Sequence, residues 1–275
     1  PPPPPPPTPP QGLGRRQRQM CIRDRRNATC HLEHPSLAMR LSSIIGTQID
    51  IAIKLLPRSI YKRTQVIAET ALSKALKTAV SSLRHQQYRD PNDHMYRFLA
   101  AGSGAVGGLF GVYSLPLELG VSTTIMLRSI AEIARSEGED INDPETQIAC
   151  LEVFALGGES EVDDAAESGY YGLRLALSWP VTHAAHHLAR NGLVAEGPVL
   201  TSLITAISTR FGFAVSQKTA ALMIPLIGAA SAATINVAFM NHFQEMARGH
   251  FIVRRLERKY GKDLVQSNYE NFVNA

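Results

Sequence analysis

The sequence predicts an all-α protein, organised as a single multi-helix domain over residues 26–275. Three observations predict this fold class. Apolar residues recur every three or four positions, as on one face of a helix, and no segment shows the alternation of a strand bounded by turns. Two uncharged Gly/Ala-rich runs, 98–117 and 219–241, have the length and composition of buried helices. We expect these two runs to pack nearly backbone to backbone, with the other helices around them.

Residues 1–25 are predicted to be a disordered tail outside this domain. PPPPPPPTPP is low-complexity polyproline, which cannot pack a core, and MCIRDR (20–25) resembles a translated sequencing adapter from a metagenomic assembly. We interpret the tail as an assembly artefact; a natural Pro/Arg tail is the alternative. The tail holds five Arg and one Asp, and the rest of the chain has 23 basic and 23 acidic residues. Because that remainder is neutral, its charge does not indicate nucleic-acid binding.

In the first half of the domain, helical pieces at 35–56 precede an amphipathic helix that we expect to start at Pro57 and run to about Gln87. Asp90-Pro91-Asn92 is a break and a capping region. A glycine-rich arm follows, then a bend at Pro116 and a helix that ends near Glu137.

In the second half, Asp143-Pro144-Glu145 predicts a helix start, because Asp caps free N–H groups and Pro is tolerated at the first position. The expected helices there are 145–156, a helix from Val162 broken at Trp179-Pro180, 181–190, 198–211, 215–228 and a basic helix at 242–262. Gly212 is expected to separate the helices 198–211 and 215–228.

The glycines of the first apolar run form two overlapping G-x-x-x-G steps, Gly104/Gly108 and Gly107/Gly111. Such steps let helices approach closely in lipid, and the same spacing also packs helices inside a soluble core. Each run also contains a proline, Pro116 near the end of the first and Pro225 early in the second, which continues with Gly228. These residues are candidates for membrane insertion or for tight packing, and the sequence leaves both open. The basic helix at 242–262, with six basic and two acidic residues, suits either an anionic membrane surface or a solvated face.

Long stretches of the chain resemble one known family. LRSIAEIARSEGEDINDPETQIACLEVFALGG with DDAAESGYYGLRLAL, and the later IPLIGAASAATINVAFMNHFQEMARGHFIVRRLERKYG, are similar to proteins of the EcsC family, over about residues 35–262. The resemblance implies a bacterial protein with a link to ABC transport, because the family takes its name from a gene beside an ABC-transporter pair. It brings no catalytic motif to place on the chain.

One candidate functional group is the polar set Glu118, Arg128, Glu132 and Arg135. Glu118 is the only charged residue between Arg97 and Arg128, and a buried carboxylate without a partner marks a site; pairing with Arg128 or Arg248 is the alternative. The spacing of the other three predicts a carboxylate held between two guanidiniums, as a structural clamp or an anion site.

A second candidate is the acidic block from Ser136 to Leu173, which holds eleven acidic and no basic residues. We expect the basic segments 40–97 and 242–262 to compensate it; the alternative is a divalent cation at Asp163, Asp164 and Glu167. No other cofactor is predicted. His183, His186 and His187 have a spacing that can hold zinc, but without H-E-x-x-H or paired cysteines they are expected to be surface residues.

The sequence contains no G-x-S-x-G and no phosphate-binding G-x-x-x-x-G-K-[ST] motif, and Cys150 is expected to be a buried thiol. We therefore predict a non-enzymatic accessory or interaction protein, cytoplasmic and peripheral to, or shallowly inserted in, the inner membrane. Its expected partner is a membrane surface or a membrane protein, not nucleic acid. The alternatives are a metal-dependent hydrolase or lipid-active enzyme that uses the block 137–167, and a soluble helical scaffold.

Overall fold

The computed structural model describes residues 57–83, 92–110, 114–157, 169–191, 197–223 and 229–273, with 24, 26–32, 37 and 41 from the N-terminal part. Regular structure in these residues is helical, without a strand, which confirms the all-α prediction. The main helices are α4 (Arg58–Leu83), α5 (Asp93–Phe110), α6 (Leu115–Ser136), α7 (Pro144–Leu156), α8 (Tyr170–Asn191), α9 (Pro198–Leu222), α10 (Ala229–Tyr260) and α11 (Lys262–Val273).

Local sequence signals explain several helix ends. The Asp143 carboxylate caps α7 by accepting a hydrogen bond from the Thr146 N–H at 3.2 Å, with Pro144 in the first turn, as predicted. Gly138, after α6, and Gly261, between α10 and α11, have φ of +83° and +87°. Only glycine adopts this left-handed conformation without strain, so both positions end a helix cleanly.

Two predicted helix breaks are wrong. The structure continues α8 through Pro180, although proline removes one backbone hydrogen bond. Leu177 before it and Ala184 after it are both buried, so packing holds the two halves of the helix in line. Gly212 does not divide α9 either. A Cβ there would lie 3.1 Å from the Gln65 Cγ of α4. This glycine allows close helix packing rather than a turn.

The two uncharged runs are each shared between two helices. Run 98–117 includes the end of α5 and the start of α6, and run 219–241 includes the end of α9 and the start of α10. Within the described residues, the helix that is long and apolar enough to cross a membrane is α9, Pro198–Leu222, with a mean hydropathy of 1.4. Its apolar window is 56% buried inside the protein, so a core helix explains it equally well.

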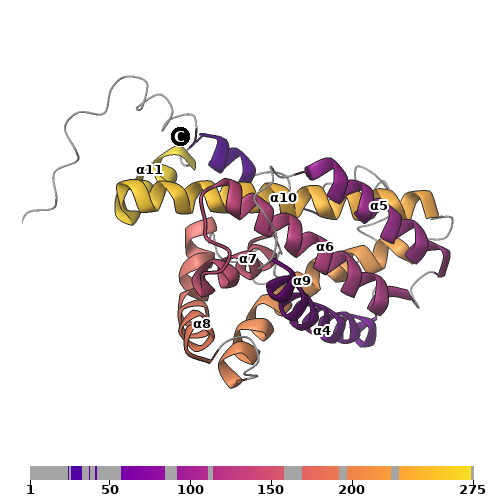
Figure 1. Cartoon of the computed structure of the whole chain (residues 1–275). Helices are drawn as coiled ribbons and strands as arrows, with labels where there is room; N and C mark the ends of the chain where they lie inside the picture. Colours follow the sequence, from indigo (N-terminus) through magenta and orange to yellow (C-terminus); the bar gives the residue numbers. More distant parts are fainter. Residues whose placement is uncertain are drawn as a thin grey trace, which may run out of the picture.

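The longest helix, α10, packs against α5, α6, α7 and α11 (Figure 1). Helix α10 lies against α5 and α6, while α4 packs on α6 and α9. Helix α7 packs on α8 and α9 toward the other end. The centre of the core is aromatic, because the Phe154 ring centroid lies 4.9 Å from that of Phe211 and 5.2 Å from that of Phe243. These three rings join α7, α9 and α10.

Candidate functional site

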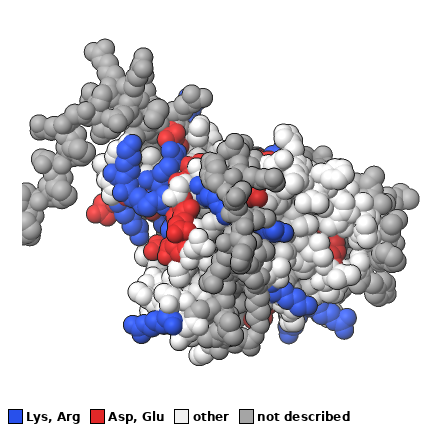
Figure 2. Space-filling view, in the orientation of Figure 1, with Lys and Arg blue, Asp and Glu red and all other residues white. Residues whose placement is uncertain are grey.

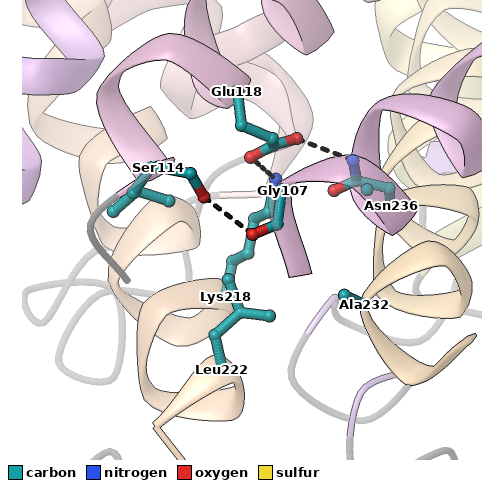
Figure 3. Close-up of a pocket in the computed structure, with 9 residues that line it drawn as sticks. Gly107, Ser114, Glu118, Lys218, Leu222, Ala232 and Asn236 are labelled. Atoms are coloured by element: carbon teal, nitrogen blue, oxygen red, sulfur yellow. Dashed lines mark hydrogen bonds and ion pairs between the residues drawn. The ribbon is translucent and has the colours of Figure 1, made fainter. Parts of the chain in front are cut away.

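Four helix ends meet around a small pocket at one end of the molecule (Figures 1 and 3). The contributing segments are the second half of α5, the first turns of α6, the end of α9 and the start of α10. The pocket encloses about 220 Å³ of empty space, part of it open to solvent. Its lining consists of Gly104, Gly107, Ser114, Leu115, Glu118, Lys218, Leu222, Ala232 and Asn236.

The centre of this site is the side chain of Glu118, which is 8% exposed. One carboxylate oxygen accepts a hydrogen bond from the Lys218 ammonium at 2.6 Å, and the other accepts one from the Asn236 amide at 2.6 Å (Figure 3). Lys218 is itself only 2% exposed, and its Nζ lies 5.5 Å from the centroid of the Phe239 ring. The site therefore contains one buried negative and one buried positive charge in direct contact.

Asn236 connects this ion pair to α5. Its amide nitrogen also lies within hydrogen-bond distance of the Ala100 carbonyl, at 3.1 Å, and the Ser103 hydroxyl, at 3.2 Å. The Oδ1 atom of Asn236 is buried and has no hydrogen-bond partner. On the other side of the pocket, the Ser114 hydroxyl donates to the Gly107 carbonyl at 2.8 Å, joining α5 to the first turn of α6.

Two of the predicted glycines shape the pocket directly. A Cβ at Gly104 would lie 2.7 Å from the backbone oxygen of Ala232, and a Cβ at Gly107 would lie 2.7 Å from the Glu118 Cγ. By contrast, a Cβ at Gly102 would meet nothing within 4 Å. Of the other candidates, Gly108 lies in α5, Pro116 is exposed in the first turn of α6, and Gly111, Pro225 and Gly228 are outside the described residues.

Both predictions for Glu118 are wrong, since the carboxylate is buried but not without a partner, and its partner is neither Arg128 nor Arg248. Arg248 forms its ion pair with Asp93, and no ion pair joins Glu118 to Arg128. The true partner, Lys218, lies 100 residues away along the chain. A signal for it exists in the sequence, because Lys218 is the only charged residue between Arg210 and Glu245. A lone cation in one apolar segment complements the lone anion in another.

The predicted clamp of Arg128, Glu132 and Arg135 does not form. Glu132 accepts a hydrogen bond from the Tyr96 hydroxyl at 2.6 Å, and neither arginine makes an ion pair with it. Burial and the contact with Glu132 raise the pKa of Tyr96 above its ordinary value. Glu132 thus accepts a hydrogen bond from an uncharged hydroxyl rather than from an arginine. This bond links α5 to α6 and is separate from the Glu118 cluster.

The acidic block is compensated by α10, as predicted for the segment 242–262. Glu137 pairs with Arg255 at 2.8 Å, and Glu139 pairs with both Arg254 and Arg258. Burial alone would raise the pKa of Glu139, but the hydrogen bonds and charges of these two arginines outweigh it and lower that pKa. Arginines of α10 therefore pair with the acidic residues at the start of the block, whereas residues 159–167 lie outside the described part of the chain.

The structure bears differently on the alternative cation site and on the three histidines, which were expected to be surface residues. Asp163, Asp164 and Glu167 lie outside the described residues. His183 stacks on Trp179, with ring centroids 4.3 Å apart, and its Nδ1 lies 2.9 Å from the Trp179 carbonyl. No group of three His, Cys, Asp or Glu side chains suited to a metal ion occurs in the part of the chain that the structure describes.

Sequence analysis missed a second buried polar cluster, at the opposite end of α10. His250 is fully buried and its Nδ1 lies 3.0 Å from the Tyr170 hydroxyl, while its Nε2 has no hydrogen bond and lies 3.9 Å from Glu152. Burial raises the pKa of Glu152 and lowers that of His250, so the protein favours the neutral form of both. Beside them, Arg174 and Glu257 form a bidentate ion pair.

Comparison with known proteins supports one assignment. The model of the EcsC protein family matches residues 31–256. Searches of curated proteins and of solved structures found no match. The family match covers most of the chain and confirms the resemblance that the two long sequence stretches indicated. The protein belongs to the EcsC protein family.

Proposed function

We propose that this protein is a non-enzymatic accessory protein that binds a membrane surface through its apolar end. It would act at the cytoplasmic face of the inner membrane, peripherally or with shallow insertion, as a partner of a membrane protein. A link to ABC transport is part of this proposal and rests on the family resemblance alone.

The observation that carries the proposal is a set of exposed apolar side chains on α5 and α6. Phe98 is 78% exposed and Val106 61%, and with Gly102 between them they lie on one face of α5. On α6, Leu117 is 77% exposed and Val121 46%. We call Phe98, Gly102, Val106, Leu117 and Val121 the apolar edge.

The apolar edge lacks charge because the surrounding sequence is uncharged and Glu118 faces inward. The chain has no charged residue from Phe98 to Leu117, and the next one, Glu118, faces inward to Lys218. In Figure 2 this part of the surface is largely free of Lys, Arg, Asp and Glu, whereas both signs gather over the opposite end of α10. The buried ion pair therefore keeps the one carboxylate between Arg97 and Arg128 away from the surface.

The free energy gained by burying the apolar edge in a membrane is sufficient for reversible binding. Each large apolar side chain gains roughly 1.5–3 kcal/mol when it is fully removed from water. Partial immersion of the four large side chains of the apolar edge gives a free energy of the same order as one myristoyl chain, which supports reversible membrane attachment. Exposed apolar patches of this kind mark protein or membrane contacts.

The test is co-sedimentation of the purified protein with phospholipid vesicles. We expect the wild-type protein to pellet with vesicles, and the double variant Val106→Asp/Leu117→Asp to remain in the supernatant. The matched control is Leu175→Asp, which changes a leucine that is 73% exposed on α8. This control should pellet like the wild-type protein, and thermal melting of all three should agree.

Two results would overturn the proposal. One is a wild-type protein that stays in the supernatant with every vesicle composition. The other is a control variant that loses binding as completely as the double variant, because binding would then not depend on the apolar edge.

A further inference from the structure

Helix α4 presents exposed cations that have no acidic partner among the described residues. Arg58, Lys62, Arg63 and Lys74 are all exposed, and none of them makes an ion pair in the described part of the chain. The one acidic residue of α4, Glu69, accepts a hydrogen bond from the Thr205 hydroxyl at 3.0 Å. The exposed side of α4 is therefore a basic face, which we define by its four cations.

The basic face differs from the other basic helix of the protein. On α10, Arg248 pairs with Asp93, Arg254 with Glu139, and Arg255 with Glu137. Those guanidiniums are neutralised within the fold, whereas the charges on α4 remain available to an external partner. Sequence analysis expected segment 40–97 to compensate the acidic block as well, but the four cations of the basic face form no ion pair with the described acidic residues of that block.

The basic face lies beside the apolar edge. Helix α4 packs on α6, and α6 packs on α5, so that α6 lies between the other two (Figure 1). Figure 2 shows Lys and Arg side chains in the region of α4, next to the uncharged end of the molecule. The exposed cations and the exposed apolar side chains thus lie on neighbouring helices.

From this combination we propose that the basic face of α4 binds the headgroups of anionic phospholipids while the apolar edge enters the bilayer. The inference rests on the proposed function and adds the lipid class to it. Charge complementarity supplies the argument: unpaired Lys and Arg near an anionic membrane are attracted to it, and apolar side chains beside them deepen the contact.

The apolar residues favour a membrane over a nucleic acid as the partner. Val66 is 63% exposed in the middle of α4, between Lys62 and Thr70 on the same side of the helix. An interface with phosphate backbones is polar and strongly basic throughout, whereas an interfacial helix carries exposed apolar side chains among its cations. Nucleic-acid binding is kept as an outcome of the test.

The test compares two triple variants that remove the same amount of charge. Lys62→Gln/Arg63→Gln/Lys74→Gln changes the basic face. The control, Arg190→Gln/Lys259→Gln/Lys262→Gln, changes three exposed cations on α8, α10 and α11. Binding is measured by flotation with vesicles of phosphatidylcholine alone and with vesicles that contain 30–40% (about one third) phosphatidylglycerol, at low and high salt.

We expect the wild-type protein and the control to bind anionic vesicles much more tightly than neutral ones. The α4 variant should lose about 100-fold in affinity for anionic vesicles, since each cation near an anionic surface contributes about fivefold. Its weaker binding to neutral vesicles should stay unchanged. Circular dichroism and thermal melting check its fold, and the single variant Lys62→Gln provides a smaller change if the triple variant is unstable.

The outcomes separate this inference from the proposed function. Equal binding of the wild-type protein to neutral and anionic vesicles overturns the anionic-lipid inference alone. An equal loss in the control and the α4 variant overturns it too, because net charge would then explain the effect. Binding of a DNA or RNA duplex through α4, with no vesicle binding, overturns both proposals.

Discussion

The two ends of α10 hold two buried carboxylates in opposite situations. At the apolar end, Glu118 contacts both an ammonium and an amide. At the other end, Glu152 lies 3.9 Å from His250, and burial favours the neutral form of both groups. The comparison shows that two buried carboxylates can differ in their partners: Glu118 directly contacts a cation, whereas at Glu152 burial outweighs the charges of Arg174 and Arg254 and raises the pKa.

The largest effect is expected when the partner of Glu118 is removed. In Lys218→Met, the carboxylate stays buried without its cation, which should lower the free energy of unfolding by about 3–5 kcal/mol. The double variant Glu118→Gln/Lys218→Met should recover part of this loss, because the amide can still contact Asn236. Urea denaturation at pH 7 measures all three proteins. A loss below about 1 kcal/mol would mean that water reaches the ion pair.

A smaller effect is expected from the close approach of α5 and α10 at the same end. Gly104→Ala places a methyl group against the Ala232 backbone oxygen, and such overpacking destabilises by about 1–3 kcal/mol. The control Gly102→Ala meets open space, so it should stabilise the protein by up to about 1 kcal/mol, as expected for Gly to Ala in a helix. Thermal denaturation of both variants measures their stabilities relative to the wild-type protein. Equal melting temperatures would contradict the packing described.

The other end should respond to pH through Glu152. Burial raises its pKa above the ordinary 4.5, against the opposing charges of Arg174 and Arg254, so the folded protein binds this proton more tightly than the unfolded chain. Its contribution to stability is therefore complete below pH 4.5 and is lost as the pH rises through the folded-state pKa.

Glu152→Gln removes this proton-binding group and leaves a neutral side chain of similar shape. The variant should gain stability relative to the wild-type protein as the pH rises above 4.5. His250 acts in the other direction, because its lowered pKa makes stability fall as the pH drops below 6.5. Urea denaturation at a series of pH values from about 4 upward, which starts near the ordinary carboxyl pKa, measures the difference in unfolding free energy between the variant and the wild-type protein. A constant difference across this range would show that Glu152 titrates normally.

The smallest effect is expected at the exposed ion pairs of the charged end. Arg255, whose side chain is 41% exposed, contacts Glu137 at 2.8 Å. Solvent screens such pairs, so Arg255→Gln should change the free energy of unfolding by less than about 1 kcal/mol. A change as large as that of Lys218→Met would mean that exposed and buried ion pairs contribute equally here.

Local sequence signals predicted much of the fold and one residue of the site. Periodic apolar residues indicated helices, Asp143 and Pro144 marked the start of α7, and the isolated charge of Glu118 identified it as unusual. These predictions succeed because capping, proline geometry and apolar periodicity act over one or two helical turns. Because these signals are local, they predicted helix breaks at Pro180 and Gly212 that do not occur. There, contacts with other helices outweighed the local preference to end the helix.

The sequence by itself determined the helical class, the family and the isolation of Glu118 in an apolar run. Only the tertiary structure decided that Lys218 neutralises it and that Tyr170 meets His250. It also decided that Arg254 and Arg255 of α10 form ion pairs, whereas the four cations of the basic face form none with the described residues. The physical reason is that an ion pair or a hydrogen bond depends on distance in space. Helices far apart in the chain must pack before either partner is defined.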